Sequence, residues 1–401
     1  MPKRLINIVR SVATGNSDTL DVDLRNLLAA LRSYYEMDAA FISHFQDDKR
    51  YIELIDLGPA AEAIALQEGD SGPREWSFCQ RVADRRMPSL IVDAQTHPSS
   101  SDLPITQDTG IGTHMSVPIW DEGDTYGMLC CFSLQVNRTI SERDIKVLDL
   151  LASLVGQRIA RAREEDQRHE RLHNEILEII QSRAYRTVFQ PITNIRTQQI
   201  SGYEALTRFE DGRRPDEVFR MAGQAQLQSA LETAAVKSAI SHLSGLQEGR
   251  YLSVNVSAQT VADPEFQATV LSARPEQIVI ELTEHDAVEN YQQLIDDLAP
   301  LRAAGVRLAV DDVGSGYAGF KHILTLLPDI IKLDRSLITG LPDSQAKRAM
   351  VAAMVGFAGE TGITLVGEGI ETEDECEAAL QLGVVFGQGY LLGRPEEAMA
   401  N

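Results

Sequence analysis

The stretch VRLAVDD, residues 306–312, is a short apolar run that ends in two adjacent aspartates. Aliphatic and β-branched residues bounded by turn signals predict a buried strand. Similar runs recur from about Tyr185 onward, and helix-like stretches follow most of them, as at 286–304 and 343–361. The eight strand candidates are RTVFQPI, ISGYEAL, RYLSVNV, QIVIELT, VRLAVDD, IIKLD, ITLVGEG and VVFGQGY. Strands alternating with helices in this way predict a closed α/β barrel with the helices outside.

Polar side chains stand where these predicted strands end. Six are acidic, and one asparagine, one lysine and one glutamine accompany them: Glu204, Asn255, Glu281, Asp311, Asp312, Lys332, Glu368, Glu371 and Gln388. Carboxylates that converge on one point repel one another unless cations hold them there. Oxygen ligands without Cys or His suit Mg²⁺, Mn²⁺ or Ca²⁺ better than zinc. The pattern predicts a metal-dependent enzyme site rather than a set of unrelated surface salt bridges.

The adjacent Asp311 and Asp312 are able to serve two metal ions, one carboxylate bridging them and the other bound to a single ion. Metal pairs about 3.5–4 Å apart recur in phosphodiester hydrolysis. Lys332 would neutralise charge on the phosphate or orient the water, and Arg208 would form a forked contact with a phosphate oxygen. The residues therefore favour a phosphodiester substrate.

The segment GSGYAG, residues 314–319, offers a different interpretation, because it matches the G-x-G-x-x-G pattern of dinucleotide-binding proteins. It follows a predicted strand and precedes a helix, and Asp334 lies further along, at the spacing that the pattern requires. However, Asp311 and Asp312 stand just before the glycines, where they would repel a bare pyrophosphate. A glycine-rich loop beside a metal site is the interpretation that we favour.

Composition excludes several other classes of function. The chain has 401 residues and a net charge of −22, which argues against general nucleic-acid binding and against an anionic membrane surface. No apolar run approaches the roughly 20 residues that span a bilayer, and the start lacks a secretory signal. The four cysteines, Cys79, Cys130, Cys131 and Cys376, fit no metal spacing and no disulfide framework. We therefore expect a cytoplasmic protein with reduced thiols, in which Cys130 and Cys131 are small core residues rather than a redox pair.

The first part of the chain predicts an α+β module with an antiparallel sheet. A helical pattern over 20–35 precedes the strand candidates AAFISHF, YIELIDL, HMSVPIW and TYGMLCCFSL. Ser141 and Asp144 then form a capping box for a helix that continues to about Ser182. Apolar residues at steps of three and four along it leave two interpretations open, a two-stranded coiled coil or a solvated linker helix.

Residues from about 185 to 396 resemble the EAL domain, the cyclic di-GMP phosphodiesterase domain of bacteria. The resemblance rests on FQPI, EALTR, NVS, ELTE, DDVGSGY, IKLD, GEGIET and QGYLLGRP, which occur in that order. It implies a modified TIM (β/α)8 barrel that opens cyclic di-GMP to linear pGpG with two Mg²⁺ or Mn²⁺ ions.

The resemblance also implies a role for each matching residue. The metal ligands would be Glu204, Asn255, Glu281, Asp311 and Asp312, with Asp311 shared between the ions. Lys332 and Glu368 would hold or deprotonate the attacking water, Glu371 would support them, and Glu284 would anchor the glycine-rich loop. The substrate-binding residues would be Gln190, Leu206, Arg208 and Gln388, and Gln388 would also support the water-binding pair.

The chain departs from the family pattern in three places. Val313 stands where the family usually has Phe, Ala318 and Gly319 replace two serines, and Gly367 replaces an alanine. Val313 removes an aromatic side chain that would pack the loop. Because no candidate ligand is missing, we expect reduced or regulated activity rather than none.

Residues 18–165 resemble a GAF domain, through MDAAFISHF, SFCQRVADRRMPSLIVDA, THMSVPIW, TYGMLCCFS and ERDIKVLDLLA. The resemblance leaves the ligand of this domain unassigned. The predicted organisation is a GAF-like sensor at 18–165, a helical linker at 166–184 and an EAL-type phosphodiesterase domain at 185–397.

The leading hypothesis is a cytoplasmic homodimeric enzyme whose GAF domain regulates cyclic di-GMP hydrolysis, with no DNA, RNA or membrane partner. A cyclic di-GMP receptor that barely cleaves its ligand is the alternative. A protein-interaction scaffold is a third interpretation, and it predicts no nucleotide binding.

Overall fold

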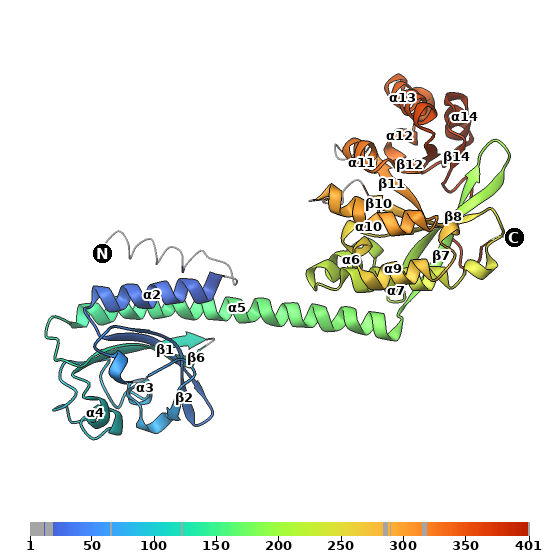
Figure 1. The fold of residues 1–401 in the computed structure, drawn as a ribbon. Helices are drawn as coiled ribbons and strands as arrows, with labels where there is room; N and C mark the ends of the chain where they lie inside the picture. The colour runs from blue at the N-terminus through green and yellow to red at the C-terminus, as the bar shows by residue number, and fades with distance from the viewer. Residues whose placement is uncertain are drawn as a thin grey trace. The chain divides into compact units, whose positions relative to one another are not determined.

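The computed structural model describes residue 12 and residues 19–64, 66–121, 123–283, 288, 290–314 and 319–399. The chain divides into two compact units, Met1–Arg168 and His169–Asn401 (Figure 1). In the part of the chain that is described, no helix is long and apolar enough to cross a membrane.

The N-terminal unit is built on a six-stranded antiparallel sheet, which confirms the predicted α+β fold. The strand order is β3-β2-β1-β6-β5-β4. The strands are β1 (Ala39–Gln46), β2 (Lys49–Leu57), β3 (Ser71–Pro73), β4 (Leu90–Ile91), β5 (Thr113–Asp121) and β6 (Asp124–Ser133). The helices are α2 (Leu20–Tyr34), α3 (Phe78–Ala83), α4 (Pro104–Thr109) and the long α5 (Glu142–Ser182), with 3-10 turns at Glu62–Ile64 and Arg74–Trp76.

Each face of this sheet packs against its own helices. On one face, Leu27 and Leu31 of α2 and Leu148 of α5 join a core with strand residues such as Cys131. On the other face, Phe78 and Cys79 of α3 pack with Cys130 and other strand residues. Successive residues of a strand point to opposite faces, so the neighbours Cys130 and Cys131 belong to different cores.

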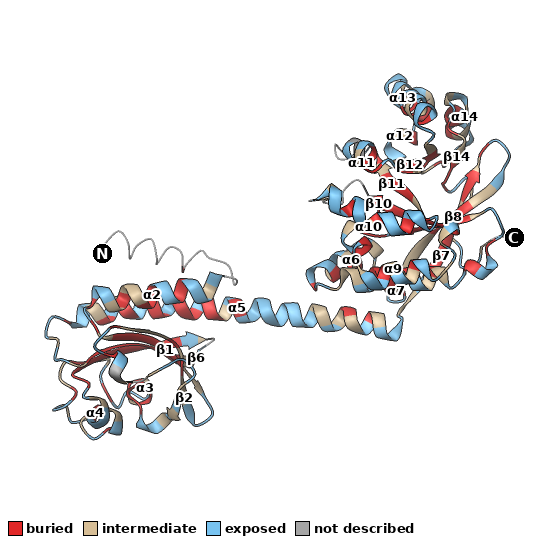
Figure 2. Ribbon diagram, in the orientation of Figure 1, coloured by how far each residue is buried: buried red, intermediate tan, exposed pale blue. Residues whose placement is uncertain are grey.

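The predicted long helix is confirmed as α5. Ser141 begins it, and both its backbone N–H and its hydroxyl donate to Asp144 Oδ2, at 2.9 and 2.8 Å. Val155 and Ile159 lie in the core of the N-terminal unit, whereas Ile176 packs against Phe209 and α6 (Pro215–Gln224) in the C-terminal unit. The stretch between them is mostly exposed (Figure 2). Packing within the chain therefore accounts for the apolar steps that made a coiled coil one interpretation.

The C-terminal unit is a closed eight-stranded barrel, as predicted, with the strand order β10-β11-β12-β13-β14-β7-β8-β9. The strands are β7 (Tyr185–Asn194), β8 (Gln199–Phe209), β9 (Tyr251–Asn255), β10 (Ile278–Thr283), β11 (Arg307–Val313), β12 (Ile330–Leu333), β13 (Thr364–Gly367) and β14 (Phe386–Gly387). All neighbours are parallel except β7, which runs antiparallel to both β8 and β14. β7 and β8 form a hairpin without an intervening helix, so the barrel is a modified (β/α)8 barrel.

Helices surround this barrel on the outside (Figure 1). Besides α6 they are α7 (Gln228–Ile240), α8 (Ala258–Val261), α9 (Pro264–Leu271), α10 (Tyr291–Ala303), α11 (Gly319–Leu326), α12 (Arg335–Ile338), α13 (Gln345–Thr361) and α14 (Glu373–Leu382). The 3-10 turns are Leu243–Gly245, Pro275–Gln277 and Leu341–Asp343.

Candidate active site

The barrel interior contains an apolar layer followed by a polar one. The apolar layer consists of Ile192, Tyr251, Val279, Ala309, Ile330 and Val366, with Phe386 packed against it. Residues two apart on a strand point to the same face. The next inward positions toward the carboxyl ends of the parallel strands carry Ser253, Glu281, Asp311, Lys332, Glu368 and Gln388. Because β7 runs the other way, its contribution, Gln190, precedes Ile192 by two positions.

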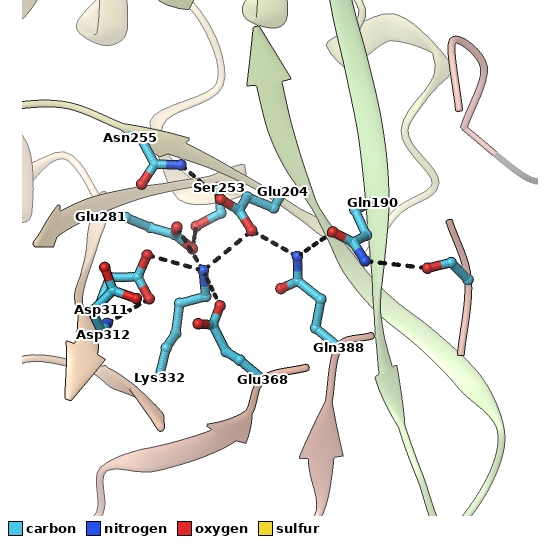
Figure 3. Close-up of polar contacts among 11 residues, drawn as sticks. Gln190, Glu204, Ser253, Asn255, Glu281, Asp311, Asp312, Lys332, Glu368 and Gln388 are labelled. Atoms are coloured by element: carbon cyan, nitrogen blue, oxygen red, sulfur yellow. Dashed lines mark hydrogen bonds and ion pairs between the residues drawn. The ribbon is translucent and has the colours of Figure 1, made fainter. Parts of the chain in front are cut away.

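Lys332 lies at the centre of the polar layer (Figure 3). Its side chain is only 1% exposed. Its Nζ lies 3.2 Å from Glu204 Oε2, 2.9 Å from Glu281 Oε2, 3.4 Å from Asp311 Oδ2 and 2.7 Å from Glu368 Oε1. One ammonium group therefore contacts four carboxylates that come from four different strands or strand ends.

The electrostatic consequences follow from this excess of acids. Burial raises the pKa of Glu281 to about 8, against the attraction of Lys332. Burial also raises the pKa of Asp311 and holds that of Glu368 well above its usual range. Burial lowers the pKa of Lys332, but the four surrounding carboxylates outweigh it and hold that pKa well above its usual value. The site thus holds more carboxyl groups than its one lysine pairs with, and burial favours the neutral form of Glu281, Asp311 and Glu368.

Glu204 is oriented by amide donors as well as by Lys332. Asn255 Nδ2 donates to Glu204 Oε1 at 2.7 Å, and Gln388 Nε2 donates to Glu204 Oε2 at 2.6 Å. The same Gln388 nitrogen lies 3.1 Å from Gln190 Oε1, and Gln190 Nε2 donates to the carbonyl of Gly393 at 3.2 Å. Although burial raises the pKa of Glu204, Lys332 and the amide donors outweigh it, and the pKa is lowered. Glu204 is therefore held as a carboxylate.

Asp311 links two groups of carboxylates. Glu204, Glu281 and Asp311 each place an oxygen within 4.8 Å of the others, and so do Asp311, Asp312 and Glu368. Asp312 has a φ of 57°, a conformation that residues other than glycine rarely adopt. Its backbone N–H donates to Asp311 Oδ1 at 2.8 Å. This turn brings two consecutive aspartates to the same site, although consecutive residues of a regular strand would face opposite sides.

The donor set fits hard divalent cations. Every acidic donor is a carboxylate oxygen, and no cysteine or histidine is among the grouped residues. Mg²⁺ and Mn²⁺ prefer such ligands, and a divalent charge would favour the ionised form of the carboxyl groups around Lys332. Asn255 adds a carbonyl oxygen that its bond to Glu204 leaves free to accept.

The structure places the remaining predicted residues in different ways. Glu371 forms an ion pair with Arg335 at 3.1 Å, and its side chain is 40% exposed. It is not one of the four carboxylates that contact Lys332. Leu206 and Arg208 line a cavity of about 350 Å³ together with Asn255. Arg208 there donates to the carbonyl of Thr207 at 2.8 Å. Glu284 and residues 315–318 of the glycine-rich segment lie outside the described residues.

Two buried residues near the site went unnoticed in the sequence. Ser253 donates its hydroxyl hydrogen to Glu281. It lies two positions before Asn255 on the same strand, so the sequence pattern could have indicated that both side chains face the site. Glu232 of α7 accepts bonds from the backbone N–H and the hydroxyl of Ser257, at 2.8 and 2.9 Å. These bonds hold the segment just after Asn255, but nothing in the helical pattern around Glu232 distinguished it.

Replacing Gln388 by alanine is expected to weaken Mn²⁺ binding by about tenfold or more, because partners that orient a ligand contribute on that scale. Glu204 would lose one of its amide donors. Calorimetric titration of Mn²⁺ into both proteins measures the difference. Gln292→Ala, which removes a glutamine that contacts Asp296 on α10, is the matched control and should bind like the original protein. Equal affinities for all three proteins would contradict this role of Gln388.

Val313 is 1% exposed and packs with Ile323, Leu333 and Ile338. It therefore faces the helices outside the barrel. Introducing the larger phenylalanine is expected to cost about 1–3 kcal/mol through overpacking and to change Mn²⁺ affinity by displacing Asp311 and Asp312. Denaturant unfolding and metal titration measure both effects, and Val313→Ile, a smaller enlargement, should show less of each. Unchanged stability and metal affinity in Val313→Phe would show that this position does not control the loop.

Comparison with known proteins agrees with this architecture. An EAL domain model matches residues 173–395, and a GAF domain model matches residues 17–160. An uncharacterized protein of Azorhizobium caulinodans is 29% identical over 252 residues, covering 58% of this chain and 34% of that protein. The cyclic di-GMP phosphodiesterase PdeF of Escherichia coli is 26% identical over 236 residues, covering 56% of this chain and 31% of PdeF. The chain thus spans about a third of the length of these curated relatives.

Among solved structures, Klebsiella pneumoniae BlrP1 in its manganese and cyclic di-GMP complex at pH 9.0 is similar, with a TM-score of 0.50 and 30% identity. The match covers 53% of this chain and 56% of that one. The EAL model covers more than half of the present chain, and the closed barrel lies within its span. The chain therefore belongs to the EAL domain family, and a GAF domain precedes its EAL domain.

Proposed function

We propose that the C-terminal unit hydrolyses cyclic di-GMP to linear pGpG with two Mg²⁺ or Mn²⁺ ions. The observation that carries this proposal is the presence of two clusters of carboxylates. The clusters share Asp311 and lie beside the buried Lys332. The relatives PdeF and BlrP1 support the substrate, since one is named a cyclic di-GMP phosphodiesterase and the other a manganese and cyclic di-GMP complex. Bound divalent ions would activate water and stabilise the leaving oxygen.

Individual residues of the chain would bind the ions, position the water and bind the substrate. Glu204, Asn255, Glu281 and Asp311 would hold one ion, and Asp311 and Asp312 the second. Lys332 and Glu368, whose charged atoms lie 2.7 Å apart, would position the attacking water and accept its proton. The substrate would be bound by Gln190, Leu206, Arg208 and Gln388, with Glu371 and Glu284 in supporting roles.

The test measures, by chromatography, how much pGpG the purified full chain forms with Mg²⁺ and with Mn²⁺. We expect metal-dependent product that a chelator abolishes. The second candidate, a receptor that barely cleaves, is favoured by Val313 at the position where the resemblance expects an aromatic residue. Binding of cyclic di-GMP without product under both metals would establish the receptor, and the absence of both binding and product would favour the scaffold.

Control by the GAF domain and formation of a homodimer belong to the same proposal. Leu172, Ile176 and Ile179 of α5 pack against the barrel unit. A shorter protein for comparison should therefore begin near His169, where the second unit begins, so that this packing is kept. A change in specific activity between the two lengths would support regulation, and sedimentation would measure the oligomeric state.

A further inference from the structure

We infer that Cys79 and Cys130 form a disulfide when a hydroperoxide reaches the cavity that Cys79 lines in the N-terminal unit. Cys79 lies in the first turn of α3 and Cys130 in β6, 51 positions apart in the chain, and their Sγ atoms are 3.5 Å apart. A disulfide needs about 2.05 Å. Both cysteines are free and buried, so a shift of about 1.5 Å would join two thiols that already touch.

The alternative partner of Cys130 is excluded by strand geometry. Cys131 is its chain neighbour but points to the opposite face of the sheet, into the core that contains α2 and α5. Burial raises the pKa of Cys131 to about 12. The reactive pair is therefore one that the chain brings together from two different elements.

A cavity gives the oxidant access to Cys79. It measures about 250 Å³ and is lined by apolar side chains, among them Phe41, Trp76 and Phe132, and by Arg50 and Cys79. One buried water needs about 10–15 Å³ of cavity volume, so a small hydroperoxide fits. Trp76 is 56% exposed, which places this part of the lining at the surface of the unit.

The surroundings of Cys79 favour its thiolate. Hydrogen bonding from Cys130 lowers the pKa of Cys79 most, burial opposes it, and Arg50 and the Ser43 hydroxyl, 3.5 Å away, lower it further, to about 6. Burial holds the pKa of Cys130 well above its usual range. Since thiolates are the nucleophiles, Cys79 is the attacking residue and Cys130 the resolving one.

The reaction is balanced without a cofactor. The Cys79 thiolate attacks the terminal peroxide oxygen, the O–O bond breaks, and the alkoxide or hydroxide that leaves takes a proton from solvent. Cys79 is then a sulfenic acid. The sulfur of Cys130 attacks the sulfur of Cys79, the S–S bond forms, and the hydroxyl leaves as water with the proton of Cys130. The two sulfurs lose two electrons, and the peroxide oxygens gain them.

The disulfide would tie α3 to β6 beside the cavity. It would therefore fix the wall that contains Phe78 and Cys79 against the sheet. This inference concerns the N-terminal unit alone and does not depend on the proposed reaction of the barrel.

The experiment uses the reduced full-length protein, treated with hydrogen peroxide and then alkylated, denatured and digested with trypsin. Cleavage after Lys and Arg places Cys79 in peptide 75–81, and both Cys130 and Cys131 in peptide 87–138. We expect the count of four free thiols to fall to two and the two peptides to be linked. Cys376, half-buried and with a pKa raised by burial, is the internal control and should stay free longer.

Two variants sharpen the assignment. Cys131→Ala should still give the linked peptides. In Cys130→Ser, whose hydroxyl keeps a donor beside Cys79, the link should vanish and dimedone should capture Cys79 as its sulfenic acid. Should Cys130→Ser fail to fold, peptide fragmentation of the original protein still identifies the linked sulfurs. A bond between Cys130 and Cys131, a bond between molecules, or loss of Cys376 before Cys79 would each overturn the inference.

Discussion

Replacing Glu204 by alanine is expected to lower cyclic di-GMP turnover by at least about 100-fold. Partners that merely orient a metal ligand already contribute about 10–100-fold, and Glu204 is placed to be a ligand itself. Its two oxygens contact Lys332 at 3.2 Å, Gln388 at 2.6 Å and Asn255 at 2.7 Å. The substitution would remove a charge and leave all three partners without their shared acceptor. Initial rates of pGpG formation at saturating Mn²⁺ measure the effect.

Two further proteins separate this effect from general damage. Glu210→Ala removes an exposed acid just beyond the same strand and should keep full turnover. Glu204→Gln keeps the shape of the side chain, and we expect it to remain folded while losing most of the turnover. Turnover within a factor of about three of the original protein in Glu204→Ala would remove Glu204 from the catalytic set.

Replacing Lys332 by methionine is expected to destabilise the C-terminal unit by about 3–5 kcal/mol in the presence of a chelator. Removing one partner of a buried ion pair has effects of this size, because the remaining charge is left uncompensated. Here one substitution leaves four carboxylates facing one another: Glu204, Glu281, Asp311 and Glu368. Denaturant unfolding of the full chain measures the loss. The free energy of unfolding is taken from the transition of the barrel unit.

The same variant has a second expected property. Mn²⁺ should raise its unfolding midpoint more than that of the original protein, because the added positive charge replaces the missing ammonium group. Lys321→Met, which removes an exposed lysine over the Tyr291 ring, should change stability by less than about 1 kcal/mol. A Lys332→Met protein as stable as the original in chelator would show that the carboxylates do not depend on this lysine.

The sequence allowed the barrel to be predicted, and it indicated which polar side chains stand at the strand ends, because both follow from short repeats. Glu281, Asp311 and Lys332 end apolar runs, and the ends of parallel strands meet at one rim. The antiparallel course of β7 was not predictable, since its apolar pattern is the same in either direction. The convergence of four acids on Lys332 also depends on strands that are distant in the chain. Glu232 and the contact between Cys79 and Cys130 had no local signal, because each joins a helix to a segment that the sequence does not place beside it.

The direction of β7 determines where α5 reaches the barrel. Arg183, with a φ of 54°, ends the helix, and Tyr185 then pairs with Phe209 at the last position of β8. The chain thus enters at the rim where the parallel strands finish, rather than at the opposite rim where a regular barrel would begin. Only a few residues further along, Gln190 contacts Gln388. A displacement of the last turn of α5 would therefore be transmitted to the carboxylates along the first half of β7, without crossing the barrel.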